Sequence, residues 1–197
     1  MKGSQQMKLL FITSNPAKIE LAKERLSKYK IEVVQQPMKL NECRSMEVEE
    51  VAMDKARQAL NKLTENFLIE DSAFYIDSLN GFPGTFIKTA FDTLGEDRIV
   101  NLVKNEPNKK AIAKSVLAFG NPITKEIKLF TGTYEGEISL EPRGSNMRGW
   151  KVVRIFIPKG WNKTLAELDD NEWQKFLEEF RKNDHFDKLG KWLQRQS

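Results

Sequence analysis

The sequence predicts a single α/β domain. Apolar runs at residues 8–13 and 67–70 are typical of short buried strands, and residues 16–29 and 47–63 have the spacing of helices with one buried face. From residue 111 onward, β-branched and aromatic residues predict antiparallel strands that extend the sheet. The chain has 197 residues, which fits one domain at the usual ~100–200 residues per domain.

The elements of the first half follow from local signals. The first strand ends in Ser14-Asn15-Pro16, where Asn15 is expected to cap a helix and Pro16 to take its first position. A second strand is predicted at residues 31–34. The strand at residues 67–70 is expected to carry Asp71 and Ser72 at its carboxyl end.

The second half is predicted to continue the sheet and to end in a helix. A turn-rich loop at residues 78–84 leads to short helices near 86–91 and 96–103. Strands are expected at residues 111–119, 127–134, 136–140 and 152–157. Residues 171–195 are expected to be helical, with these core candidates: Trp173, Phe176, Leu177, Phe180, Leu189 and Trp192.

Composition excludes several classes of protein. Hydrophobic residues make up 40% of the chain and charged residues 30%, so the chain has the composition of a globular protein and not of a disordered one. A single cysteine, Cys43, and a single histidine rule out an internal disulfide and a Cys/His zinc site. These features indicate a reducing compartment, the cytoplasm.

Neither a membrane span nor a signal peptide is predicted. No apolar run approaches the ~20 residues that cross a bilayer, and residues 1–6 lack the hydrophobic core of a signal peptide. We expect residues 1–6 to be a remnant of expression, with Met7 as the natural start and one domain over residues 7–197.

The charge pattern argues against a nucleic-acid-binding protein. The net charge is +4 and the pI is about 9.0, but Lys and Arg are scattered among 28 acidic residues without a dense basic block. A mixed, solvated surface is the simpler interpretation. A modest positive bias also favours polyphosphate ligands near a cleft.

The first candidate site is the turn TSNPAK at residues 13–18. Free backbone N–H groups at a helix start bind phosphate, and Lys18 adds a positive charge. Taken alone, the same residues are better explained as an ordinary capped helix with a solvated lysine.

The second and third candidate sites concern a metal and a glycine loop. The second site is Glu70-Asp71-Ser72 at a strand end, together with Glu50 on the long helix, because Mg²⁺ takes carboxylate oxygens together with phosphate oxygens and water. In the loop NGFPGTFIK, Gly84 lets backbone approach a ligand and Lys88 can reach its phosphates. A solvated helix face and a structural turn are the ordinary alternatives.

Five segments, taken in order, resemble a known family. They are SNPAK, VEEVAMDKA, EDSAFYIDSLNGFPGTFIK, FTGTYEGEI and IFIPKGWNKTLAEL. The family is the inosine triphosphate pyrophosphatases, house-cleaning enzymes for non-standard purine nucleoside triphosphates. The resemblance covers most of residues 7–190. It implies a long, mixed, curved β-sheet flanked by helices, with two lobes around a central active-site cleft. It also implies a homodimer that hydrolyses a nucleoside triphosphate to monophosphate and pyrophosphate with Mg²⁺.

The resemblance also implies roles for individual residues. Glu50 and Asp71 correspond to the metal and water-activating carboxylates, and Lys18 acts with them in catalysis. Which carboxylate is the ligand and which is the base stays open. The implied substrate-binding residues are Thr13, Ser14, Asn15, Lys18, Ser72, Gly84, Lys88, Trp150, Lys182 and His185.

The sequence departs from the family where the base is read. The family's aromatic-Gly-aromatic-Asp-Pro run is replaced by WKVVR at residues 150–154, with Val153 at the aspartate position. The family's Ser-His-Arg is replaced by Asp-His-Phe, which keeps His185 and puts Phe186 in place of arginine. Trp150 can still stack on a base. His185 taken alone would more often be structural.

Two changes in one subsite predict an altered or relaxed base preference, because a polar site discriminates through the groups it leaves unpaired. Arg148, Lys151 and Arg154 are alternative donors. Arg181 or Lys182 is the substitute for the family's phosphate-binding lysine.

Three other hypotheses compete with the hypothesis that the chain is a pyrophosphatase of this family. The altered base subsite also suits a nucleotide-binding module with lost catalysis, which the intact carboxylates oppose. Nucleic-acid binding rests on the basic pI alone. The related septum-inhibitor-type nucleotide pyrophosphatases usually start with Ser-x-Ser-Pro-Arg, which the TSNPAK turn does not match.

Overall fold

The computed structural model describes residues 7–182 and 184–196. The predicted expression remnant, residues 1–6, lies outside this part of the chain. The helices are α1 (Pro16–Ser27), α2 (Val48–Leu60), α3 (Ile87–Val103), α4 (Asp170–Arg181) and α5 (His185–Gln194), with short 3-10 turns η1 (Asp77–Leu79) and η2 (Leu165–Glu167). The strands are β1 (Met7–Phe11), β2 (Ile31–Gln35), β3 (Phe67–Ile76), β4 (Pro83–Gly84), β5 (Lys110–Asn121), β6 (Glu126–Ile138) and β7 (Phe156–Pro158).

The seven strands form one mixed sheet in the order β2-β1-β3-β5-β6-β7, with β4 paired to β3. β1 runs parallel to both β2 and β3, and the remaining pairs are antiparallel. β5 and β6 pair over their whole lengths and form the longest ladder of the sheet. The predicted α/β fold on a long mixed sheet is confirmed.

One edge of β3 is interrupted. β1 pairs with β3 only at Phe67 and Leu68, and β4 pairs with it only at Phe74 and Tyr75. Between these pairs, residues 69–73 have no strand neighbour on that side within the described part of the chain. The Lys18 side chain lies beside this stretch and donates a hydrogen bond to the Glu70 carbonyl.

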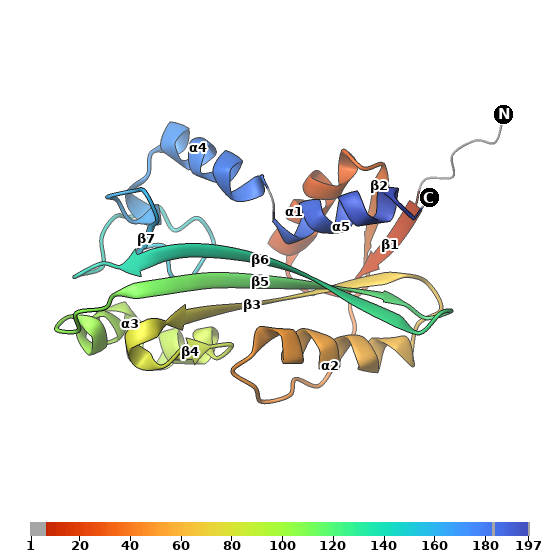
Figure 1. Cartoon of the computed structure of the whole chain (residues 1–197), viewed down its shortest axis with the longest axis horizontal. Coiled ribbons are helices and arrows are strands. Elements are labelled where there is room, and N and C mark those ends of the chain that lie inside the picture. The colour runs from red at the N-terminus through yellow and green to blue at the C-terminus, as the bar shows by residue number, and fades with distance from the viewer. Residues whose placement is uncertain (1–6, 183, 197) are drawn as a thin grey trace.

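Helices cover both faces and define two halves of the molecule (Figure 1). α2 packs on one face through a core that includes Leu10, Phe67 and Val116. α1 and α5 pack on the other face over Leu68 and Leu117. At the far end of the sheet, α3, α4 and β7 surround a third core. The end of the sheet that carries α1, α2 and α5 and the end that carries α3, α4 and β7 are called the two lobes below.

The predicted strand at residues 67–70 was too short. β3 continues to Ile76 because residues 67–76 pair along their whole length with β5. Asp71 and Ser72 therefore lie in the middle of a strand and not at its carboxyl end. As neighbours in a strand, their side chains point to opposite faces of the sheet.

Three later elements also differ from prediction. The expected strands at residues 127–134 and 136–140 are one strand, β6. The strand expected at residues 152–157 is reduced to β7, and residues 151–155 form turns. The two short helices after the glycine loop are one helix, α3, kinked at Gly95.

The long C-terminal helix is divided in two. α4 ends at Arg181, and Asp184 caps α5 by accepting a hydrogen bond from the Asp187 N–H. Of the predicted core residues, Phe176 and Leu189 are fully buried, and the other four pack against the core as partly buried side chains.

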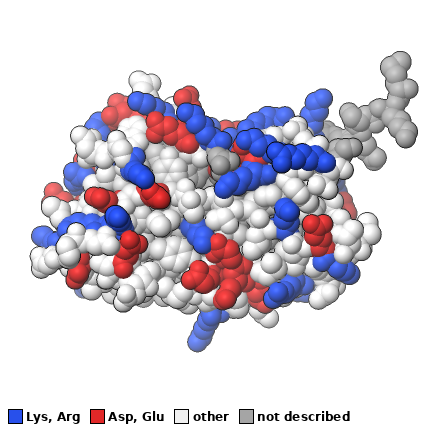
Figure 2. All heavy atoms as spheres, in the orientation of Figure 1, with Lys and Arg blue, Asp and Glu red and all other residues white. Residues whose placement is uncertain are grey.

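The surface carries charges of both signs. Figure 2 shows lysine and arginine side chains interspersed with acidic ones across the face in view. In the part of the chain that the structure describes, no helix is both long enough and apolar enough to cross a membrane.

Candidate active site

A cleft of about 260 Å³ lies on the α1 and α5 side of the sheet. Its walls come from the first turn of α1, the middle of β3 and β5, the start of α3 and α5, the end of α4 and the segment 149–152. The predicted site residues among those lining it are Asn15, Lys18, Ser72, Trp150 and His185. Segments that are far apart in the sequence therefore meet at one cleft.

Asn15 shapes the start of α1 beside this cleft. Its side-chain oxygen accepts a hydrogen bond from the Ala17 N–H at 2.9 Å, and its own N–H donates to Thr13 Oγ1 at 3.0 Å. Thr13 therefore stabilises the turn and does not line the cleft. Ser14, Asn15 and Ala17 are exposed, so the helix start is open to an anion.

A buried carboxylate links Lys18 and His185. Glu70 Oε1 lies 3.0 Å from His185 Nε2, and Glu70 Oε2 lies 3.6 Å from Lys18 Nζ. Lys18 Nζ also donates to the Glu70 carbonyl at 3.0 Å. Burial tends to raise the pKa of Glu70, but the charge of Lys18 and the hydrogen bond from His185 outweigh it and lower that pKa to about 2.

The contact between α1 and α5 holds His185 in place. Arg25 donates through Nε and Nη2 to Asp184 Oδ2 at 3.1 and 2.9 Å, and this pair is buried. Asp187 accepts from Lys28 at 2.6 Å and from the Tyr29 hydroxyl. Burial and the hydrogen bond to Asp187 raise the pKa of Tyr29 to about 12. These contacts fix the helix start that carries His185.

Asp71 faces the other side of the sheet, toward α2. Its Oδ1 lies 2.5 Å from Lys55 Nζ, and Lys55 Nζ lies 3.4 Å from Glu42 Oε1. Burial lowers the pKa of Lys55, but the charge of Asp71 outweighs this effect and the pKa lies above its usual value. Asp71 belongs to the part of β3 that has no strand neighbour on one side, and it is not among the residues that line the cleft.

Sequence reasoning missed Glu42 and Lys55. Lys55 lies one helical turn after the buried Val51 on α2, and a lysine on an apolar stripe is a signal that the helical spacing contains. Glu42 lies in an irregular segment and carries no comparable signal. Glu50, the predicted metal ligand, accepts a hydrogen bond from Ser45 Oγ at 2.6 Å and makes no recorded contact with Asp71.

Asp71 and Glu42 have carboxylate oxygens of the kind that bind Mg²⁺, and the Lys55 ammonium lies between them. Asp71 Oδ2 is buried and has no hydrogen-bond partner, while Asp71 Oδ1 and Glu42 hold the Lys55 ammonium between them. No group of three or more His, Cys, Asp or Glu side chains suited to a metal occurs among the described residues. Mg²⁺ commonly takes one or two protein carboxylates and completes its shell with phosphate oxygens and water.

Other predicted ligands lie outside the cleft. Lys88 pairs with Asp92 at 2.9 Å, and its side chain is 84% exposed. Gly84 pairs with Phe74 and packs against Met46. Lys182 is exposed and caps the end of α4, and Arg181 pairs with Glu24.

The residues that replace the family's base-reading aspartate and arginine are buried in the core. Val153 is fully buried in the core beneath α4, and Phe186 is fully buried in the core beneath α1 and α5. Among the alternative donors, Arg148 is held by Asp170 and the Leu168 carbonyl, and Arg154 is held by Glu96 and the Gly144 carbonyl. Only Lys151 lines the cleft, where it also pairs with Asp92.

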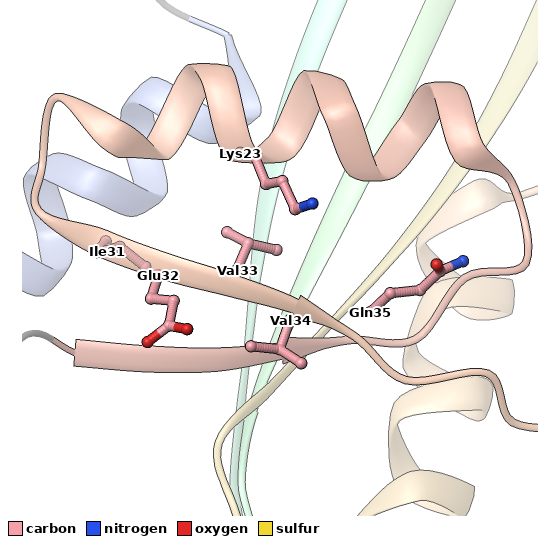
Figure 3. A pocket seen from close by; sticks show the side chains of 6 residues that line it. All are labelled: Lys23, Ile31, Glu32, Val33, Val34 and Gln35. Atoms are coloured by element: carbon pink, nitrogen blue, oxygen red, sulfur yellow. The ribbon is translucent and has the colours of Figure 1, made fainter.

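Two other hollows lie on the surface. One of about 430 Å³ lies along β2, and the Lys23 side chain points from α1 toward this strand (Figure 3). It is open and holds none of the residues discussed above. The other, of about 510 Å³, shares Gly149, Trp150 and Lys151 with the cleft and extends it toward α3.

The fold and the cleft define an α/β protein with an exposed helix start, a buried carboxylate, Glu70, and an aromatic wall around one groove. The chain belongs to the Ham1 family, whose sequence model matches residues 9–181. It is similar to a dITP/XTP pyrophosphatase of Methanopyrus kandleri, with 39% identity over 84% of this chain and 87% of that protein. It is also similar to one of Thermococcus kodakarensis, with 36% identity over 84% of this chain and 88% of that protein. A HAM1 protein from Coxiella burnetii has the same fold, with a TM-score of 0.79, 25% identity and coverage of 96% of this chain and 99% of that one.

Proposed function

We propose that this protein is a nucleoside triphosphate pyrophosphatase of the nucleotide-pool house-cleaning type. It hydrolyses ITP, dITP or XTP-like triphosphates to the monophosphate and pyrophosphate with the help of Mg²⁺. The observation that carries the proposal is Asp71, whose buried, unpartnered oxygen lies beside Lys55 at the open edge of β3. The names of the relatives support this substrate class.

Positively charged groups of the site bind and neutralise the phosphates of the substrate. The open start of α1 and Lys18 bind phosphate oxygens, and Lys55 adds a second positive charge at Asp71. Mg²⁺, when bound, offsets phosphate charge and lowers the pKa of its water. Asp71 would be its ligand or would orient the attacking water, with Glu50 or Glu42 as the second carboxylate. Lys55 pairs with both Asp71 and Glu42 and would have to release them to a bound ion.

The base end of the cleft supports a changed base preference. Trp150 and Phe180, with ring centroids 5.6 Å apart, offer an aromatic wall on which any base can stack. Lys151 is the cationic donor nearest to them. Buried Val153 and Phe186 cannot replace the aspartate and arginine of the family, so discrimination between bases is expected to be weaker.

The test is pyrophosphate release with Mg²⁺ across ITP, dITP, XTP, GTP, ATP and the pyrimidine triphosphates. Asp71→Asn should abolish turnover and leave the melting temperature within a few degrees. Asp97→Asn, an exposed aspartate on α3, is the matched control and should keep full activity. Unchanged turnover of Asp71→Asn would remove this carboxylate from the mechanism.

The same panel separates an enzyme from a nucleotide-binding module. Triphosphates that stabilise the protein against heat without any turnover would support the binding module. Turnover confined to ITP, dITP and XTP would mean that other residues replace the missing base readers. Broad turnover would support a relaxed base subsite.

We also propose that the protein is a homodimer in the cytoplasm, as the family resemblance implies. Sedimentation equilibrium at micromolar concentration would test the dimer, with the mass of one chain as the contradicting result. Cell fractionation would test the compartment.

A further inference from the structure

A row of small residues crosses the middle of the sheet beneath the cleft. Ser72 of β3 pairs with Ser115 of β5, which pairs with Gly132 of β6. Cross-strand neighbours point to the same face, which here is the face of α1 and α5. We call these three residues the small row.

The rows on either side of the small row carry larger side chains, except at Ala113. On one side lie Glu70, Leu117 and Phe130. On the other side lie Phe74, Ala113 and Tyr134, of which Phe74 and Tyr134 pack into the third core. The small row is therefore flanked by larger side chains at every position except Ala113, which also lines the cleft.

The small row stays open although its strands are interior ones. Ser72 is exposed and Ser115 is half-buried, and their hydroxyl oxygens lie 2.9 Å apart. A Cβ at Gly132 would lie 2.9 Å from His185 Nδ1, so this position needs glycine for the histidine ring to fit. Central strand positions normally carry apolar side chains that fill the space above them, and two hydroxyls here form the floor of the cleft.

The row has hydrogen-bonding capacity left for a ligand. Each serine hydroxyl offers one donor and two acceptor sites, and the bond between Ser72 and Ser115 uses one donor and one acceptor. His185 Nδ1, next to Gly132, is buried and has no partner. The polar groups beside the small row are thus only partly satisfied within the protein.

The position of the row within the cleft decides which part of a nucleotide lies on it. Lys18 and the start of α1 stand over the row that contains Glu70, which makes that end the phosphate end. Trp150 and Phe180 stand at the end that contains Phe74 and Tyr134, which makes it the base end. Rows two residues apart along a strand are separated by roughly 7 Å, and a sugar separates phosphate from base by a comparable length.

We propose that Ser115 is a specificity-determining residue that hydrogen-bonds a sugar hydroxyl of the bound nucleotide. This inference rests on the proposed function and adds to it a contact that the family motifs do not include. Ser115 holds Ser72 from the neighbouring strand, so the two hydroxyls act as one donor-and-acceptor pair under the sugar. The pair favours a nucleotide that carries the sugar hydroxyl that it contacts, and the test below identifies this hydroxyl as the 2′ or the 3′ group.

The test combines substitutions of Ser115 with substrates that each lack one sugar hydroxyl. The value of kcat/KM is measured for ITP, 2′-deoxy-ITP and 3′-deoxy-ITP with the wild type, Ser115→Ala and Ser115→Cys. Ser27→Ala, at the far end of α1, is the matched control. Loss of one neutral hydrogen bond should lower kcat/KM for ITP by roughly 2- to 12-fold, and the analogue that lacks the contacted hydroxyl should lose less than twofold.

An equal loss for all three substrates, or no loss for any of them, would overturn the proposal. Absence of wild-type turnover on every triphosphate would instead count against the proposed pyrophosphatase. In that case, dissociation constants of the same three nucleotides, measured with wild type and both variants, apply the same criterion to Ser115. Circular dichroism and the melting temperature establish that each variant is folded.

Discussion

At the scale of single residues, one buried carboxylate, Glu70, connects two side chains that line the cleft. Glu70 has a side chain that is only 6% exposed, and it lies between Lys18 and His185. A buried carboxylate is tolerated when cationic groups and hydrogen bonds compensate for the lost water. Glu70 therefore ties the first turn of α1, through Lys18, to the start of α5.

The stability of the protein should fall in acid partly because of Glu70. Its pKa is about 2 in the folded chain and ~4.3 in an unfolded one. Since the folded value is the lower one, the contribution of Glu70 is complete above about pH 4 and is lost as the pH falls toward 2. Glu70→Gln should be less stable than wild type at pH 7 by ~2–3 kcal/mol, and the difference should shrink in acid.

Urea denaturation at pH 7, 5, 4 and 3 measures this difference. Glu126→Gln, an exposed position at the start of β6, is the control and should match wild type at each pH. A gap between wild type and Glu70→Gln that stays constant from pH 7 to 3 would contradict the assigned charge.

At the scale of elements, the break between α4 and α5 gives each helix a different partner. α4 packs on the third core, and α5 packs against α1. Gly190 of α5 lies against Tyr29, because a Cβ there would come within 2.1 Å of the Tyr29 ring. Tyr29 is itself held by its hydrogen bond to Asp187, so the ring has little freedom to move.

Gly190→Ala should therefore destabilise the protein. Alanine favours a helix over glycine by ~1 kcal/mol, but overpacking against Tyr29 costs ~1–3 kcal/mol, and the rigid ring favours the upper end of this range. Urea denaturation should show a net loss of stability, and Gln194→Ala, at an exposed position of the same helix, should not. A gain in stability for Gly190→Ala would mean that Tyr29 moves aside freely.

Some elements could be predicted from the sequence because their signals are local. Asn15 and Pro16 fixed the start of α1, and the apolar spacing fixed α2 to within a turn at each end. β3 was cut short in prediction because Glu70, Asp71 and Ser72 are polar. In the structure these polar side chains have polar surroundings. Glu70 and Ser72 line the cleft, and Asp71 pairs with Lys55.

The candidate site was predicted in part for the same reason. Asn15, Lys18, Ser72, Trp150 and His185 do meet at one cleft. Ser115 was not expected in the cleft, and Glu42 was not expected beside Lys55 and Asp71, because their roles depend on pairings between distant segments. Glu70 was predicted with Asp71 and Ser72 as part of a metal site, but its pairing with His185 was not expected. A sequence contains no local sign of which face of a central strand will stay open.

At the scale of the whole molecule, the cleft lies where the two lobes meet. A ligand that bridges its walls should stabilise the folded chain as a unit. At 100 times its dissociation constant, a ligand adds ~2.7 kcal/mol, which raises the melting temperature of a chain of this size by roughly 5–11 °C. A non-hydrolysable inosine triphosphate analogue with Mg²⁺ should give this shift.

Chelation of the metal should reduce the shift, and Asp71→Asn should reduce it in the same way. Calorimetric scans with and without EDTA measure both effects. An equal shift with and without Mg²⁺ would contradict a metal shared between Asp71 and the phosphates.

The ladder between β5 and β6 has a consequence for how the chain folds. Phe119 and Phe130 belong to the core under α1 and α5, while Ala111 and Ile138 of the same two strands belong to the core under α3 and α4. Backbone hydrogen bonds run without a break from one core to the other. The two lobes therefore have no seam between them, and we expect neither to survive proteolytic excision or to melt ahead of the other.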